Sequence, residues 1–450
     1  MDEQDNPVMH VQELLFLKDW AGARNLLRDV PAPDIADLLL ALAKNDRILL
    51  FRLLPRSQAS DAFSYLESSQ KDDLLKELSD EEAKELLADL YPDDLAEFLE
   101  EMPGRATQRL LNLLDRDDRL EALQLLGYPE RSVGRLMTPY YVAVRPEWTV
   151  AEALKHIRER GQDSETIHVI HVVDPWWKLL DTLSLRRFIL AGPDDTVEQL
   201  MDHSFVSINA FEDREEAVRR IQHYDLVTLP VVDSDGVLLG IVTVDDVLDV
   251  AQKEVTEDFQ RSAAVTPLRT GYRDATLSSL FSKRVGWLAV LVIVNLASGG
   301  IIAYHEDLLA SSIALAFFIP LLIATGGNAG AQSATLMVRA MATGDVKPGQ
   351  YAWVVGRELV MGLVLGISLG LLAWLLGFYR GGIEMALVVS LAMAGIVLVT
   401  NLLGAGLPFI LSSLRMDPAV ASSPLVTSIA DVVGLAIYFS IASNILGLAG

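Results

Sequence analysis

The chain has 450 residues, of which 51% are hydrophobic and 22% are charged, and its formal net charge is −24. Residues 285–450 hold five Lys or Arg and seven Asp or Glu; subtracting these from the totals of 37 and 61 leaves 32 basic and 54 acidic residues in 1–284. Two halves so unlike exclude a single soluble domain. The acidic half also argues against a nucleic-acid binder, which needs a basic surface, and favours metal cations or basic partners. The absence of cysteine excludes disulfides, thiolate zinc sites and cysteine nucleophiles.

We predict an α-helical, superhelical domain over residues 1–130, because apolar residues recur there at three- and four-residue spacing. The segment repeats: Asp34-Ile-Ala-Asp-Leu-Leu39 matches Asp94-Leu-Ala-Glu-Phe-Leu99. Such internal repeats are typical of stacked helical hairpins. No catalytic constellation stands out in this domain, and most of its carboxylates fit an ordinary solvated face.

A second repeat occupies residues 131–252, where Val172-Val-Asp174 matches Val231-Val-Asp233. Each unit has a strand, a helix, two short strands and a closing helix, which predicts an α/β pair. The segment resembles a tandem pair of cystathionine-β-synthase (CBS) modules.

In the CBS family, a stretch such as Gly240, Thr243 and Asp246 can hold an adenosine ribose. The first unit departs from this pattern, with Asp181, Ser184 and Arg187 at the matching places and Trp176-Trp177 in place of Asp235-Gly236. We therefore do not favour adenine-nucleotide binding, which stays an open alternative.

Residues 253–282 have, in their first part, the composition of an amphipathic connecting helix. Carboxylates are dense in this helix and in the unit before it. Hard divalent cations take oxygen ligands, and Mg²⁺ binds through one or two carboxylates while keeping several waters. We expect Mg²⁺ to hold such acidic surfaces together and the surfaces to repel one another without it.

Five apolar runs follow, each long enough to cross a membrane, at about 285–304, 311–341, 351–378, 383–413 and 423–448. About 20 residues rising about 1.5 Å each span a hydrocarbon core of about 30 Å. We predict an all-α transmembrane domain of five helices over residues 283–450, embedded in the cell inner membrane.

The basic residues beside these runs predict their orientation. One side of the membrane receives Lys283, Arg284, Arg339, Lys347, Arg357 and Arg415, whereas the connection His305-Glu306-Asp307 has no Lys or Arg. We therefore expect the N-terminal domains to be cytoplasmic and the C-terminus to face outside. The acidic N-terminus has no apolar segment typical of a cleaved signal peptide.

Polar residues inside the last run mark a candidate ion path. Ser423, Thr427 and Asp431 are spaced i, i+4, i+8 and share one helix face. A carboxylate near the bilayer centre costs about 2.5–3.5 kcal/mol, so Asp431 should face protein or water. The alternative, an Asp paired with a neighbouring helix, lacks basic residues at that depth, and we favour a pore.

The second run carries Gly326 and Gly330, a G-x-x-x-G pair that lets helices approach closely. Helix packing alone would account for these glycines. The helical spacing of Asn328, Gln332 and Thr335 also suits a water-lined path. Other polar residues of the spans, namely Asn295, Ser298 and Asn401, fit either interhelical contacts or lining.

The whole chain resembles the MgtE family of Mg²⁺ channels. The most specific segments are Pro320–Thr335, with its glycine-rich centre, Val242-Thr-Val-Asp-Asp-Val-Leu-Asp249, and Asp417-Pro-Ala through Ser428-Ile-Ala-Asp431. The resemblance implies a homodimer whose two-fold axis is the pore, with Asp431 facing a hydrated Mg²⁺ and Ser423, Thr427, Asn328, Gln332 and Thr335 lining the path. Ser423 and Ala331 replace Asn residues found in some members.

The resemblance also implies a set of carboxylates that sense cytosolic Mg²⁺. They are Asp61, Asp93, Glu97, Asp213, Glu215, Asp225, Asp246, Asp249, Glu254, Glu257 and Asp258. Their expected role is to close the channel when cytosolic Mg²⁺ is high.

We therefore expect a Mg²⁺ channel without enzymatic activity that admits divalent cations, with membrane lipid, Mg²⁺ and a second copy of the chain as its partners. The alternative is a membrane-anchored CBS sensor that binds adenine nucleotide and transports nothing, which leaves the Asp431 stripe unexplained. An anion channel with CBS modules would need basic residues deep inside the spans, and the sequence has none near the centres of the five runs.

Overall fold

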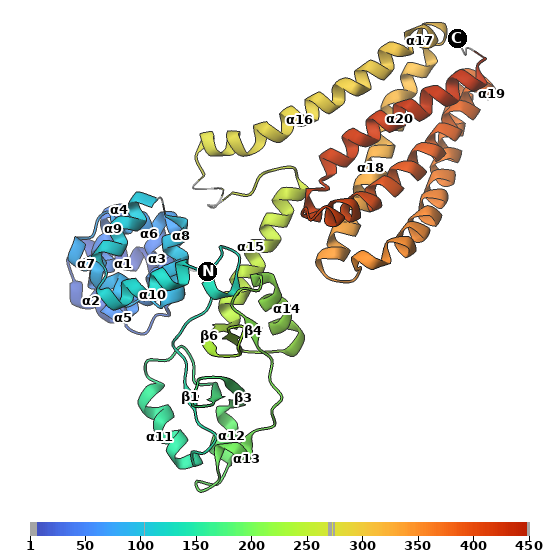
Figure 1. Ribbon diagram of the computed structural model, residues 1–450. Helices are drawn as coiled ribbons and strands as arrows, with labels where there is room; N and C mark the ends of the chain where they lie inside the picture. The colour runs from blue at the N-terminus through green and yellow to red at the C-terminus, as the bar shows by residue number, and fades with distance from the viewer. Residues whose placement is uncertain (1–6, 103, 269–271, 273–274, 448–450) are drawn as a thin grey trace. The chain divides into compact units, whose positions relative to one another are not determined.

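The computed structural model describes residues 7–102, 104–268, 272 and 275–447. The chain divides into two compact units, Met1–Glu254 and Val255–Gly450. Figure 1 labels the helices and strands of both units.

Short helices form the first part of unit Met1–Glu254. In the described residues they are α1 (Pro7–Phe16), α2 (Trp20–Leu27), α3 (Ala32–Ala41), α4 (Lys44–Leu53), α5 (Arg56–Ser64), α6 (Ser68–Leu75), α7 (Asp80–Ala88), α8 (Pro92–Glu101), α9 (Gly104–Leu113) and α10 (Arg116–Leu126). Helices this short depend on packing for stability. Their apolar faces meet in one core, in which Phe63 and Phe98 pack edge to face at 5.7 Å. The predicted helical domain is confirmed.

Two α/β modules complete this unit. Their elements are η1 (Val133–Arg135), β1 (Ala143–Val144), α11 (Val150–Arg160), β2 (Val169–Val173), β3 (Leu179–Ser184), α12 (Leu185–Leu190), α13 (Val197–Leu200), β4 (Ile208–Asn209), α14 (Arg214–Tyr224), β5 (Thr228–Val232) and β6 (Leu238–Thr243). Each module has a three-stranded sheet, β1-β2-β3 or β4-β5-β6, whose first pair is parallel and second pair antiparallel. This order confirms the predicted α/β pair.

The two hairpin turns of the modules hold each other through backbone hydrogen bonds. Leu179 N donates to Gly236 O at 3.0 Å, and Leu238 N donates to Trp177 O at 2.9 Å. Gly236 has φ +84°, and Trp177 adopts the same left-handed region with φ +66°. The Trp176-Trp177 replacement therefore keeps the turn geometry of the second module, although the first module lacks a glycine there.

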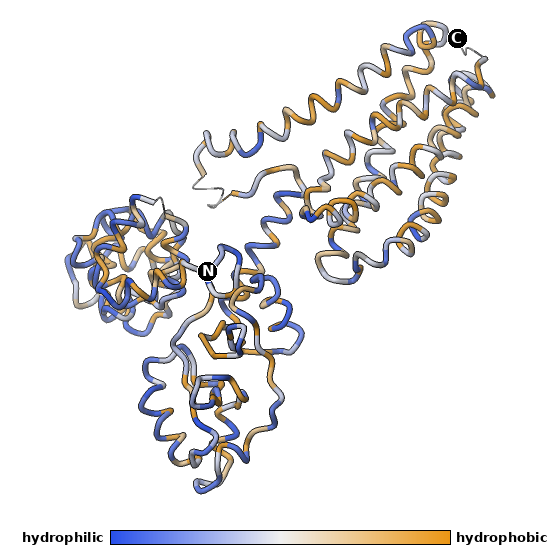
Figure 2. Tube along the Cα trace, in the orientation of Figure 1, coloured by the Kyte–Doolittle hydropathy of each residue, from blue (hydrophilic) through white to orange (hydrophobic). Residues whose placement is uncertain are grey.

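The apolar helices lie in unit Val255–Gly450, where hydrophobic residues predominate along the helices (Figure 2). In the described residues this unit contains the end of α15 (Val244–Ser262), then α16 (Leu277–Tyr304), α17 (Glu306–Ser311), α18 (Ala314–Ala342), η2 (Pro348–Gln350), α19 (Tyr351–Ser413), η3 (Pro418–Val420) and α20 (Ser423–Ile445). By length and composition, α16, α18, α19 and α20 are candidate membrane spans.

Helix α19 is two antiparallel limbs rather than one straight rod. Its 63 residues are interrupted by non-helical backbone at Gly381 and Gly382. Beyond this turn the limbs fold back on each other: a Cβ on Gly377 would lie 2.7 Å from Ala386 Cα, and one on Gly366 would lie 2.8 Å from Ala394 O. Four candidate helices, one of them double, give five apolar helical segments in the described residues, as predicted.

The connecting segment differs from the predicted range 253–282. Helix α15 starts at Val244 inside the second CBS module and continues to Ser262, and α16 already begins at Leu277. The boundary falls inside a helix because no Gly or Pro interrupts residues 244–262, whereas Pro267 follows soon after.

Helices α18 and α19 approach most closely at a pair of glycines. A Cβ on Gly404 would lie 2.1 Å from the carbonyl oxygen of Gly330, whereas a Cβ on Gly299 of α16 would meet nothing within 4 Å. Backbone contact this close excludes any side chain at position 404.

We predict that Gly404→Ala destabilises unit Val255–Gly450, called the membrane unit below, by about 1–3 kcal/mol, because overpacking forces the helix backbones apart. For a unit of this size, each kcal/mol lowers the unfolding midpoint by about 2–4 °C. Thermal unfolding of the detergent-solubilised protein measures the change. Gly299→Ala is the matched control, and equal midpoints for the two variants would contradict the close crossing.

Candidate functional site

A polar stripe runs along the start of α20 and meets α18. Thr427 Oγ1 donates within its own helix to Ser423 O and Pro424 O, both at 3.0 Å. Opposite it, α18 presents Gly327, on which a Cβ would lie 3.1 Å from Thr427 Cγ2. Because Gly327 has no side chain, α18 and α20 can make close contact at Thr427.

Beside this contact lies an open groove of about 490 Å³. It is lined by Asn328, Ala331, Gln332, Thr335, Leu336 and Ser423. Four of the five residues predicted to line a pore therefore share one groove, and the fifth, Thr427, lies at the adjoining helix contact. The arrangement offers amide and hydroxyl groups, which suit water or a hydrated cation.

Asp431 lies two helical turns beyond Ser423 on the same helix and is half-buried. Among the described residues, no Lys, Arg or His forms an ion pair with its carboxylate. The alternative in which a neighbouring helix supplies a cationic partner therefore finds no support in the described part of the chain.

A second carboxylate of the membrane unit, Glu358, was not singled out in the sequence. It lies on the first limb of α19 and accepts hydrogen bonds at Oε2 from Asn401 Nδ2 (2.6 Å) and Ser333 Oγ (3.1 Å). Asn401 is buried, which favours an interhelical contact over pore lining for this residue. The only signal for Glu358 in the sequence is an ionisable residue inside an apolar run.

In unit Met1–Glu254, acidic side chains gather between α8, α15 and the loop before β2. Asp93 is 9% exposed, and its Oδ1 is buried without a hydrogen-bond partner among the described residues. Burial and the charge of Asp246 raise the pKa of Asp93 well above its usual range. Burial raises the pKa of Asp246 to about 7, although Thr243 Oγ1 donates to it at 2.7 Å. The raised pKa values mean that the neighbouring carboxyl groups of this acidic surface resist being ionised at the same time.

Further carboxylates add to the same acidic surface. Burial, then Asp245 and Asp94, raise the pKa of Glu165 to about 7. Burial and Glu97 raise the pKa of Asp249. Burial would also raise the pKa of Glu97, but its ion pair with Lys253 lowers it. Predicted residues Asp93, Glu97, Asp246 and Asp249 therefore lie together, and Glu165 joins them without having been predicted.

The remaining predicted carboxylates have other surroundings. Glu215 and Glu254 each lie 2.8 Å from Arg131, with Asp213 at 3.8 Å, and Arg214 pairs with Glu254 at 2.7 Å. Of the other members, Asp61 is exposed on α5, Asp225 lies at the left-handed end of α14, Glu257 pairs with Arg261 at 3.1 Å, and Asp258 is half-buried on α15. Among the described residues, no three acidic or histidine side chains are close enough to hold a metal ion directly.

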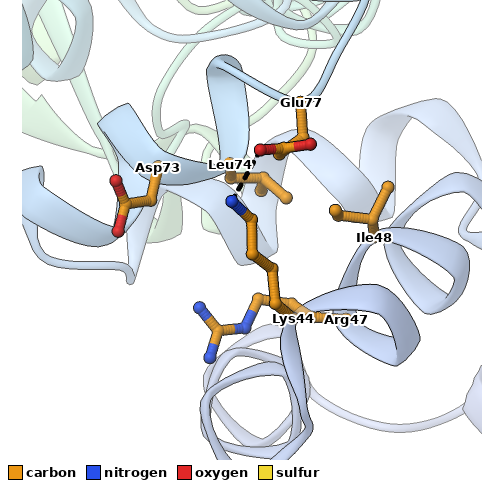
Figure 3. Close-up of a pocket in the computed structure, with 6 residues that line it drawn as sticks. All are labelled: Lys44, Arg47, Ile48, Asp73, Leu74 and Glu77. Atoms are coloured by element: carbon orange, nitrogen blue, oxygen red, sulfur yellow. Dashed lines mark ion pairs between the residues drawn. The ribbon is translucent and has the colours of Figure 1, made fainter.

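A smaller pocket of about 210 Å³ lies in the helical domain between α4 and α6–α7 (Figure 3). The Lys44 ammonium points to Glu77 and pairs with it at 2.6 Å. Arg47 donates to the carbonyl oxygens of Leu39 and Leu42. Because its cationic groups are engaged within the domain, we assign this pocket no function.

The two CBS modules differ where an adenosine ribose would bind. Asp181, which stands where the second module has Gly240, is fully buried and accepts from the backbone N–H groups of Asp202 (2.8 Å) and His203 (2.9 Å). Arg187 pairs with Asp202 at 2.6 Å. These side chains serve the fold of the first module.

Comparison with protein families gives a match to each part of the chain. A profile described as "MgtE intracellular N domain" matches residues 30–131, CBS-domain profiles match 133–193 and 197–253, and a profile described as "Divalent cation transporter" matches 319–441.

Curated proteins similar to this chain include two magnesium transporters named MgtE. The one from Thermus thermophilus is 39% identical over 446 residues, which are 98% of this chain and 99% of that protein. The one from Bacillus subtilis is 34% identical over 325 residues, 72% of each.

Two solved structures resemble the soluble part of the chain. The cytosolic domain of the Mg²⁺ channel MgtE in complex with ATP has a TM-score of 0.52 and 39% identity, and covers 54% of this chain and 99% of that one. The soluble part of a magnesium transporter has a TM-score of 0.53 and 28% identity, and covers 55% of this chain and 97% of that one.

The raised pKa values predict how stability depends on pH. Since the folded pKa of Asp246 and Glu165 is about 7, the folded chain binds more protons than the unfolded one between about pH 4 and pH 7. The free energy of unfolding should therefore fall as pH rises through this window.

Calorimetry of the full chain without divalent cations measures this slope for the first cooperative transition. Asp246→Asn should flatten it, because a neutral amide does not titrate, whereas Asp235→Asn on an exposed turn should leave it unchanged. If the stability of Asp246→Asn depended on pH as steeply as that of the wild type, the raised pKa of Asp246 would be contradicted.

Proposed function

This chain belongs to the MgtE family of magnesium transporters, and we propose that it carries Mg²⁺ inward across the cell inner membrane through a pore lined by α18 and α20. Its similarity to magnesium transporters along nearly its whole length supports transport. The same similarity argues against the alternative of a membrane-anchored nucleotide sensor that transports nothing.

Two observations on α20 carry the pore: Ser423 lines the polar groove, and Asp431, two helical turns farther along, has no cationic partner among the described residues. In a homodimer with its axis along this face, the two Asp431 carboxylates would repel each other, and a divalent ion between them would relieve the repulsion. Mg²⁺ gives up its water reluctantly, so a path lined by Asn328, Gln332 and Thr427 suits the hydrated ion.

The membrane potential is sufficient to drive influx. A divalent ion crossing about 100 mV gains about 4.6 kcal/mol, twice the value for a single charge. This proposal needs no chemical step and hence no enzymatic activity. Cytoplasmic N-terminal domains would place the acidic surface in the compartment that receives the ion, which agrees with the basic residues beside α16.

We further propose that Mg²⁺ binding to the acidic surface closes the channel. Orphaned Asp93 Oδ1 is a hard oxygen donor of the type that Mg²⁺ prefers. The carboxylates of this surface repel one another, so bound cations would favour a compact arrangement of the N-terminal domains. Moving a population from 1:99 to 99:1 needs about 5.5 kcal/mol of differential binding, which several weak sites can share.

A second ligand class for the soluble part is adenine nucleotide, since one solved relative is a complex with ATP. Only the second module keeps the Gly240, Thr243 and Asp246 pattern. Asp246 belongs to the acidic surface as well, so nucleotide and Mg²⁺ would share this residue.

Replacing Asp431 with Asn should lower Mg²⁺ uptake at least about tenfold, the equivalent of about 1.4 kcal/mol of lost ion stabilisation. Uptake is measured in a strain that lacks its own Mg²⁺ importers, with the amount of folded protein checked by size-exclusion chromatography. Asp307→Asn, an equal change on the exposed helix α17, serves as the control. Wild-type uptake by Asp431→Asn would refute the pore role.

Asp246→Asn combined with Asp249→Asn should leave the channel open at Mg²⁺ concentrations that close the wild type, because the acidic surface loses two carboxylate ligands for the cation. Patch-clamp recording with varied cytoplasmic Mg²⁺ measures closure. Glu147→Gln removes an exposed carboxylate elsewhere and should close normally. Closure of the double variant at the wild-type concentration would remove these residues from the sensor.

A further inference from the structure

Glu358 is an ionisable side chain inside the membrane unit that the proposed transport path does not use. Its Oε2 accepts hydrogen bonds from Ser333 on α18 and from Asn401 on the second limb of α19. Asn401 Nδ2 also reaches the backbone oxygen of Glu358 at 3.1 Å. One carboxylate oxygen therefore joins three helical segments.

Among the described residues, Glu358 has no cationic partner. Its neighbour in sequence, Arg357, lies instead over the Trp353 ring at 5.5 Å. An ionisable residue inside a membrane span is expensive and, as a rule, functional. An apolar side chain would fill this place at lower cost, which indicates that the hydrogen bonds made by Glu358 are what is needed.

The two faces of α18 explain what those bonds fix. Asn328, Gln332 and Thr335 line the groove on one face. Gly330 and Ser333 lie on the opposite, buried face, where Gly330 meets Gly404 of α19. Glycine contacts allow close approach but do not select one rotation of the helix, whereas the bond from Ser333 to Glu358 is directional.

We propose that Glu358 is a positioning residue for ion permeation: its Oε2 atom holds α18 against α19 in the rotation that turns Asn328, Gln332 and Thr335 toward the groove. This inference rests on the proposed transport function for its flux readout. A positioning role needs an acceptor oxygen at the reach of a Glu side chain and does not need a negative charge.

Two substitutions separate reach from charge. Glu358→Gln keeps the reach and an acceptor oxygen but removes the charge, and should transport Mg²⁺ within about twofold of wild type. Glu358→Asp keeps the charge but is one methylene shorter, and should lower transport about tenfold, the loss expected for about 1.4 kcal/mol. Glu384→Asp, the same shortening at an exposed position of α19, should have no effect. An inactive Glu358→Gln with an active Glu358→Asp would overturn the proposal in favour of a charge-dependent ion site.

Cysteine labelling reports on the rotation of α18 without relying on transport. The chain contains no cysteine, so Gln332→Cys on the groove face and Ala334→Cys on the buried face can each be placed alone. A water-soluble thiol reagent should label position 332 and spare 334, both in the otherwise unchanged chain and with Glu358→Gln. With Glu358→Asp, the difference in labelling between positions 332 and 334 should become smaller.

Ser333→Ala is a milder second variant, because it removes one donor and leaves the Asn401 bond in place. It should narrow the labelling difference less than Glu358→Asp does, which keeps the test usable if the Asp variant does not accumulate. An unchanged labelling difference in both variants would overturn the positioning role even if the chain transports Mg²⁺. A narrowed difference would support it even if the transported ion were another one.

Discussion

The membrane unit depends on how a hydrocarbon environment treats a carboxylate. Water is not available there to solvate charge, so each polar group must find a partner in the protein or face an aqueous path. Glu358 has found such partners, the side chains of Ser333 and Asn401. Asp431 has neither a hydrogen-bond partner nor a cationic partner among the described residues, and it lies on the helix whose first turns adjoin a polar groove. The contrast between the two carboxylates separates a scaffold from a candidate ion path.

The acidic surface of the soluble unit follows the same physical chemistry in a wetter setting. Burial raises the pKa of Asp246 and Glu165 to about 7, and the buried Oδ1 of Asp93 has no hydrogen-bond partner in the described part of the chain. Protonation and cation binding are two ways to relieve this excess charge. Under the proposed sensing role, a bound divalent cation would neutralise part of this charge, which would make the arrangement of these carboxylates depend on the cation concentration.

Local patterns in the sequence predicted much of this structure. Run length predicted the apolar helices, and the i, i+4, i+8 spacing placed Ser423, Thr427 and Asp431 on one face. The convergence of Ser423 with Gln332 depends on how α20 packs against α18, and the resemblance to a known family supplied that pairing. Glu358 was missed because its partner Asn401 lies across an antiparallel hairpin whose register is set by glycine contacts around Gly381, which local periodicity does not encode. The sequence pattern also separated the closing helix of the second module from the connecting helix, whereas both are parts of α15, since a helix can cross from one domain into the next without a signal in composition.

The central claim is that Asp431 faces water and acts as a waypoint for a hydrated divalent cation. Crystals of the full chain soaked in Mn²⁺, which scatters anomalously and shares the oxygen-ligand preference of Mg²⁺, test it directly. An ion held between the two Asp431 carboxylates of a homodimer should give an anomalous peak on the two-fold axis beside them. Anomalous peaks only at the soluble unit, with lipid chains packed against Asp431, would contradict it.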